Sequence, residues 1–120
     1  MKYVLMIYQN PAALQAMSES DKQVVFEEVD ALMKELTESG EWIRGEALAD
    51  PSTAKTVRVR DGVPAVTDGP YAEAKEQVVG FCIVDCETEE RAVELAGRWP
   101  DARWWGMEVR ALLTPGGTEM

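Results

Sequence analysis

The stretch Val78-Val79-Gly80-Phe81-Cys82-Ile83-Val84 is the most hydrophobic segment of the chain, and it decides how the rest is arranged. It is rich in β-branched and aromatic side chains and carries no charge, which predicts a strand. A helix is expected after it over residues 88–99, with Glu89 and Glu90 in the favourable first turn and Pro100 as the stop. The apolar stripe of this helix consists of Ala92, Leu95, Ala96 and Trp99.

A second strand is expected at the start of the chain, over Lys2–Tyr8. Alternation places Tyr3, Leu5 and Ile7 on one face and Val4, Met6 and Tyr8 on the other. Both faces are apolar, so both need a cover. Residues 9–18 are expected to form a loop with a helical turn over Pro11–Met17.

A long amphipathic helix is predicted next, starting at Ser20 with Gln23 completing a capping box, and stopping at Gly40. Its apolar residues recur at helical spacing: Val25, Val29, Leu32, Met33 and Leu36. From Glu19 to Glu41 the chain has eight acidic residues against two lysines. This surface is interpreted as a solvated face that aids solubility, or as a docking surface for a basic partner.

Trp42–Leu48 reads as a strand, and a β-hairpin is then predicted from the alternating segment Lys55–Arg60, the turn Asp61-Gly62 and the return Val63–Thr67. The last strand is expected over Trp105–Leu113. The order is therefore β-α-β-hairpin-β-α-β, an α+β, ferredoxin-like βαββαβ plan with an inserted β-hairpin arm. We expect one domain over residues 1–114 and a flexible tail over 115–120.

Two helices cover only one face of such a sheet. The other face would expose several hundred Å² of apolar surface, which soluble monomers rarely tolerate. We therefore expect a homodimer in which two sheets pack face to face.

The overall charge limits the partners of the chain. With 22 acidic and 12 basic residues the formal net charge is −10, which argues against nucleic-acid binding and against adsorption to anionic membranes. The apolar run at Met1–Tyr8 is too short for a signal peptide or a membrane span, so a cytoplasmic protein is expected.

Cysteine and histidine usage limits the chemistry. Cys82 and Cys86 lie on one face of the expected strand, roughly 13 Å apart, too far for a disulfide, and are predicted to be buried. The chain contains no histidine, which excludes an imidazole metal site, and no acidic loop has the ligand spacing of an all-oxygen site. No metal or other cofactor is predicted.

Two segments, 56–62 (Thr-Val-Arg-Val-Arg-Asp-Gly) and 67–77 (Thr-Asp-Gly-Pro-Tyr-Ala-Glu-Ala-Lys-Glu-Gln), resemble the signature of the DGPF branch of the YCII-related superfamily. The similarity extends to residues 1–8, 45–48 and 108–110, so it covers nearly the whole chain. Departures from the usual pattern are Tyr71 for Phe, Ala74 for Thr and Val79 for Gly.

The resemblance implies a small, cytoplasmic, dimeric α/β barrel. Relatives elsewhere in the superfamily are regarded as candidate enzymes that use a His–Asp pair, and one type is a dehydrochlorinase of aromatic degradation. Genes of this branch often lie beside extracytoplasmic-function sigma factors. The absence of histidine excludes a His–Asp pair in this chain.

Within the signature, Asp68 is the candidate general base, held by a turn against the end of the sheet with a raised pKa. The ligand-binding candidates are Tyr71 as a hydrogen-bond donor, Glu73 as a second acid–base group, and Lys75 and Arg58 as anion-binding cations. The structural alternatives are an Asx-type turn for Asp68 and packing or surface roles for the others.

Three functions are compatible with these residues. The first is a lyase- or isomerase-type enzyme acting on a small molecule, with a cavity near Asp68 at the dimer interface. The second is a ligand-binding or sensing protein that uses the same cavity. The third is a protein-interaction or regulatory module acting with an extracytoplasmic-function sigma factor. The sequence does not distinguish the first two.

Overall fold

The structure is a computed structural model that describes residues 1–71 and 74–120. The order of its strands and two long helices is the predicted one, and the chain is a mixed α+β protein with antiparallel sheets. The strands are β1 (Lys2–Gln9), β2 (Trp42–Ala47), β3 (Lys55–Arg60), β4 (Val63–Asp68), β5 (Gln77–Asp85) and β6 (Gly106–Ala111). The helices are α1 (Pro11–Gln15), α2 (Glu19–Ser39), a 3₁₀ turn η1 (Pro51–Thr53), α3 (Glu89–Arg98) and α4 (Asp101–Trp104).

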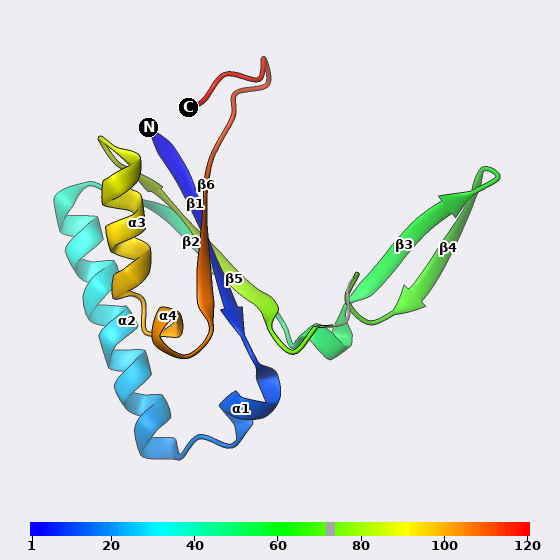
Figure 1. The fold of residues 1–120 in the computed structure, drawn as a ribbon, viewed down its shortest axis with the longest axis horizontal. Coiled ribbons are helices and arrows are strands. Elements are labelled where there is room, and N and C mark those ends of the chain that lie inside the picture. Colours follow the sequence, from blue (N-terminus) through cyan, green and yellow to red (C-terminus); the bar gives the residue numbers. More distant parts are fainter. Residues whose placement is uncertain (72–73) are drawn as a thin grey trace.

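The main sheet has four antiparallel strands in the order β2-β5-β1-β6. The hydrophobic run predicted as a strand is confirmed as β5, which pairs with β1 on one side and β2 on the other. Helices α2 and α3 lie on one face of this sheet, and the β3–β4 hairpin extends on the opposite side (Figure 1). The sheet is open in the single chain, because β2 and β6 are its edges.

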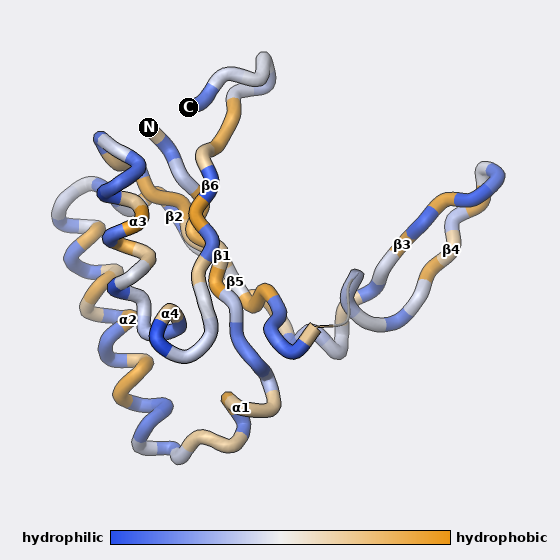
Figure 2. Tube along the Cα trace, in the orientation of Figure 1, coloured by the Kyte–Doolittle hydropathy of each residue, from blue (hydrophilic) through white to orange (hydrophobic). Residues whose placement is uncertain are grey.

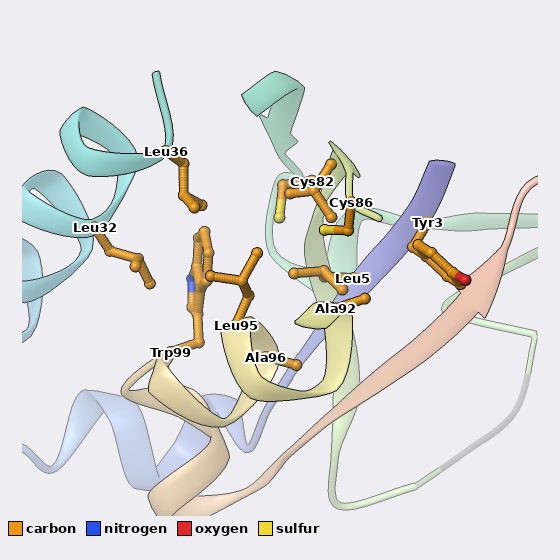
Figure 3. Close-up of a cluster of buried hydrophobic side chains, with 11 residues drawn as sticks. Tyr3, Leu5, Leu32, Leu36, Cys82, Cys86, Ala92, Leu95, Ala96 and Trp99 are labelled. Carbon is orange, nitrogen blue, oxygen red and sulfur yellow. The ribbon is translucent and has the colours of Figure 1, made fainter. Parts of the chain in front are cut away.

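The core lies between the sheet and the two long helices. Leu5 of β1 and Leu95 of α3 are fully buried, and so is Leu36 of α2. Figure 3 shows the Trp99 ring standing between the α2 leucines and Leu95. The predicted apolar stripe of the second long helix is confirmed, since Ala92, Leu95 and Ala96 are all buried.

The start of α2 differs from the prediction. Ser18, not Ser20, is the N-cap: its backbone is extended and its Oγ accepts the Asp21 N–H at 3.1 Å. Ser20 already lies inside the helix, so it cannot cap it. Gly40 ends the helix as predicted, in the left-handed region at φ 82° where only glycine is free of strain.

A partly buried ion pair joins the α2–β2 connection to α3. Arg91 donates to both carboxylate oxygens of Glu41, Nε and Nη2 each at 2.9 Å. This bidentate pairing holds the pKa of Glu41 at about 2, well below its usual value. The pair therefore fixes the end of α2 against the start of α3.

We expect Glu41→Gln to lower the free energy of unfolding at pH 7 by about 2 kcal/mol, because a hydrogen-bonded charge is lost from a partly buried site. Folding lowers the pKa of Glu41, so its contribution is present above pH 4.5 and is lost as the pH falls toward 2. Urea denaturation at pH 7 and pH 3 measures this, with Glu35→Gln, from the more exposed Arg98–Glu35 pair, as control. If Glu41→Gln loses more stability relative to the wild type at pH 3 than at pH 7, the result would contradict the stabilising role given to the Arg91–Glu41 pair.

The β3–β4 hairpin is an arm that stands apart from the main sheet, and it forms a separate two-stranded sheet (Figure 1). Hydrophobic positions alternate with polar ones along β3, whereas β4 reads Val-Pro-Ala-Val-Thr-Asp and does not alternate (Figure 2). The radius of gyration is 16.4 Å, larger than the ~14 Å of a compact domain of this length. The arm explains the difference.

The face of the main sheet away from the helices is apolar at its centre. Val4 lies opposite Ile83, and Met6 lies opposite Phe81. These side chains point away from the helices, because their neighbours Tyr3 and Leu5 are buried in the core. Charged residues border this open face, including Arg44, Glu46, Glu108 and Arg110.

Both cysteines are free and buried, as predicted. Burial raises the pKa of the Cys82 thiol to about 12. Met120 is hydrogen-bonded to the sheet end: Lys2 N–H donates to its carbonyl at 3.0 Å, and its own N–H donates to the carbonyl of Leu112 at 2.8 Å. No helix in the described ranges is long and apolar enough to cross a membrane.

Candidate functional site

An apolar groove of about 470 Å³ lies between the sheet and α2. Its helical wall is formed by Val25, Phe26 and Val29, and its sheet wall includes Ile7 and Cys82. A cavity of this size accommodates a small organic molecule. The groove is therefore the first candidate for a ligand site.

Two stacked tryptophans form part of the groove wall. The rings of Trp42 and Trp99 lie 6.5 Å apart between centroids at an interplanar angle of 13°. Gly45 makes room for this arrangement, because a Cβ at that position would lie 2.7 Å from the Trp42 ring. The sequence at the start of β2 thus shapes the groove as well as the strand.

Asp101 is the chemically distinctive residue of the groove. In the described part of the chain it is the one charged side chain that is buried, with 3% of its surface exposed. Gln9 Nε2 donates a hydrogen bond of 2.6 Å to Asp101 Oδ1. Burial raises the pKa of Asp101, and the hydrogen bond from Gln9 acts in the opposite direction.

Asp101 reaches the groove at the point where the end of β1 meets the start of α4. Gln9 is the last residue of β1, and Asp101 begins the short helix α4 directly after Pro100. Both side chains line the groove, together with Trp99. A carboxyl group with a raised pKa beside an apolar cavity is suited to receive a proton or to accept a hydrogen bond from a ligand.

Sequence reasoning missed Asp101. Its burial depends on Gln9, which lies 92 residues away in the chain, and on a four-residue helix that has no periodicity to detect. The available signal was an acidic residue placed between the apolar stripe of a helix and the two tryptophans at 104 and 105.

The structure places Asp68 elsewhere. It is the last residue of β4, opposite Lys55 of β3, and the two side chains form an ion pair. The Asp68 side chain is 83% exposed, so the prediction that a turn holds it against the buried surface of the sheet is wrong for the single chain. Asp68 does not line the groove. The reason is the pairing of β4 with β3 through to its last residue, which turns the carboxylate into solvent.

The other predicted residues lie near the base of the arm. The Arg58 guanidinium lies over the Tyr71 ring, 5.0 Å from its centroid, so these two candidates come together. Tyr71 is 77% exposed and Lys75 is also exposed. Glu73 lies outside the described residues. Among the described residues, no group of three or more Cys, Asp or Glu side chains is arranged to hold a metal ion.

Fold and groove together define a small α+β domain, with helices on one face of an antiparallel sheet and a ligand-sized apolar groove between the layers. The model of the YCII-related domain matches residues 1–114, and the chain belongs to this family. It is 30% identical over 96 residues to uncharacterized protein R00369 of Rhizobium meliloti (strain 1021), covering 80% of this chain and 77% of that protein. The predicted superfamily is confirmed, and the DGPF branch remains a prediction.

Proposed function

We propose that the chain binds a small, mainly apolar molecule in the groove between the sheet and α2, with Asp101 accepting a hydrogen bond or a proton from it. The observation that carries this proposal is the buried carboxyl group in the wall of an otherwise largely apolar groove. A buried carboxylate is costly to folding unless it is satisfied by partners. A ligand that donates to Asp101 supplies such a partner.

The acid–base version of this function is a lyase- or isomerase-type enzyme. In it, the ionised Asp101 removes a proton from the bound substrate and the resulting carboxylic acid returns it at a second position. The raised pKa of Asp101 favours this role, because it brings the group closer to neutral pH than an exposed aspartate. Gln9 would orient the carboxyl through its 2.6 Å hydrogen bond. The non-catalytic version is a ligand-binding or sensing protein that uses the same contacts.

The active form in this proposal is a homodimer with a ferredoxin-like protomer, in which two open sheet faces pack together as a dimeric α/β barrel. The half-buried Val4, Met6, Phe81 and Ile83 supply the apolar contact. The charged border of the face keeps the contact in register. The regulatory alternative, association with a sigma factor, stays a prediction of the family resemblance.

Asp101→Asn tests the proposed site. Asparagine still accepts the hydrogen bond from Gln9 but does not ionise. Because folding raises the pKa of Asp101, this group favours the folded state most at low pH, and its contribution to stability is lost as the pH rises. The variant is therefore expected to be at least as stable as the wild type at pH 7, with the difference vanishing below pH ~4.

Asp101→Asn is expected to keep its stability but to bind a ligand more weakly. The probe is N-phenyl-1-naphthylamine, a neutral aromatic molecule with one N–H donor whose fluorescence rises in apolar sites. Asp101→Asn should bind it about fivefold more weakly at pH 7, because a charge-assisted hydrogen bond is roughly twice as strong as a neutral one. Equal affinity in a stably folded variant would contradict the role assigned to Asp101.

A further inference from the structure

The arm formed by β3 and β4 presents an exposed apolar face. Val57 pairs with Val66, and Val59 pairs with Pro64, so these four side chains share one side of the hairpin. Val57, Val59 and Val66 are 58%, 65% and 62% exposed. A two-stranded hairpin alone in water is only marginally stable. The arm therefore needs a surface to lie on.

The direction of the arm indicates where that surface is. It extends on the side of the main sheet opposite α2 and α3, the same side as the open apolar face (Figure 1). Its strands span six residues each, which corresponds to about 20 Å, whereas stacked layers are about 10 Å apart. When a second protomer covers the open face, the arm is long enough to pass its sheet and reach its helical layer.

The first half of α2 offers a matching surface in that layer. Phe26 is 76% exposed and Val24 is 51% exposed, which is unusual for large apolar residues in a helix that already covers a core. Phe26 also forms part of the groove wall. An apolar element placed over Phe26 would close the groove from outside.

The charges of the two surfaces are complementary. Arg58 and Arg60 on the arm have no carboxylate partner among the residues that the structure describes, and their long side chains can reach around its edges. The first half of α2 carries five acidic residues and one lysine: Glu19, Asp21, Lys22, Glu27, Glu28 and Asp30. Of these, Glu28 is paired with Arg103 and Lys22 with Glu19. Glu27 and Asp30 have no basic partner in the described ranges, which leaves them available to an arginine.

We propose that the arm of each protomer lies over the first half of α2 of a second copy of this chain, with Val59 against Phe26, and closes the mouth of the partner's groove. The inference rests on the homodimer of the proposed function. It makes the partner subunit a contributor to each ligand site. It also gives the signature residues Asp68, Tyr71 and Arg58 a place at the base of a lid rather than inside their own chain's groove.

Cysteine cross-linking between two differently tagged chains tests the contact. One chain carries Val59→Cys and the other carries Phe26→Cys, and the chains are mixed, allowed to exchange and oxidised gently. The native Cys82 and Cys86 are buried, and burial raises the pKa of both thiols, so they do not compete. We expect a covalent heterodimer. Val59→Cys mixed with Val93→Cys, from the exposed surface of α3, is the matched control and should give none.

Charge reversal provides the second readout. Arg58→Glu with Arg60→Glu, placed in the Val59→Cys chain, should reduce the cross-linking yield at least fivefold. Glu27→Arg with Asp30→Arg in the Phe26→Cys chain should restore it. A yield that does not respond to either change would overturn the charge complementarity on which the proposed orientation depends.

Sedimentation of the wild type separates this inference from the homodimer itself. A dimer that gives no Val59–Phe26 cross-link would overturn the arm contact but not the sheet-to-sheet dimer. The exposed surface of α2 would then bind something else, such as a basic protein. A monomer would overturn both proposals.

Discussion

Trp99→Ala is expected to lower the free energy of unfolding by about 4 kcal/mol, the largest stability effect of any single substitution considered for this chain. Trp99 is 2% exposed, stacks on Trp42 and lies against the α2 leucines and Leu95 (Figure 3). Its removal leaves a cavity where α2, α3 and the sheet meet. Urea denaturation at fixed protein concentration measures the loss.

The matched control is Trp104→Ala. Trp104 is 47% exposed and contacts Trp105 and the Arg103 guanidinium at the surface. Its loss is expected to cost about 1 kcal/mol or less, because little buried area and one exposed cation–π contact disappear. Equal losses for the two tryptophans would show that Trp99 is not the central packing residue that the structure describes.

Ile83→Asp is expected to convert the proposed homodimer into a folded monomer. Ile83 lies on the open face of the sheet, opposite Val4 and beside Arg44. In the dimer the new carboxylate would lose its hydration inside the apolar contact, which costs several kcal/mol even beside Arg44 and raises the dissociation constant by roughly a thousandfold or more. In the monomer the same position faces solvent, so folding should persist.

Sedimentation equilibrium at about 10 µM, a concentration at which a specific dimer holds together, measures this change. The wild type should sediment at twice the chain mass of 13.3 kDa and Ile83→Asp at that mass. Val93→Asp, on the exposed surface of α3, is the control and should remain dimeric. A wild-type monomer, or an Ile83→Asp dimer of unchanged affinity, would contradict packing through the open sheet face.

The elements that were predictable from sequence are those with a local signal. The apolar run at 78–84, the helical stripe after Thr88 and the Asp61-Gly62 turn each encode their structure within a few residues, and all three are confirmed. The predicted start of α2 at Ser20 is wrong by two residues, because Ser18 is an equally good N-cap residue and caps the helix in the structure. Only the backbone geometry distinguishes them.

The candidate site was not predictable in the same way. The groove is formed by side chains from β1, α2, β2 and β5, and its carboxyl group becomes buried only when α4 meets the end of β1. Asp68 stands out in the sequence because it belongs to a recognisable signature, but a signature does not report burial. The pairing of β4 with β3 to the last residue decides its exposure.

The most direct test of the central claim is a fluorescence titration of N-phenyl-1-naphthylamine into Ala47→Trp. Ala47 is an exposed residue that lines the groove, so a tryptophan there is expected to fill the groove without disturbing the core. Ala49→Trp is the control, because Ala49 is also exposed and lies outside the groove. The proposal predicts one probe bound per chain in the wild type and in Ala49→Trp, and at least a tenfold loss of affinity in Ala47→Trp. Unchanged binding in a folded Ala47→Trp variant, or no binding to the wild type, would contradict the proposed ligand site.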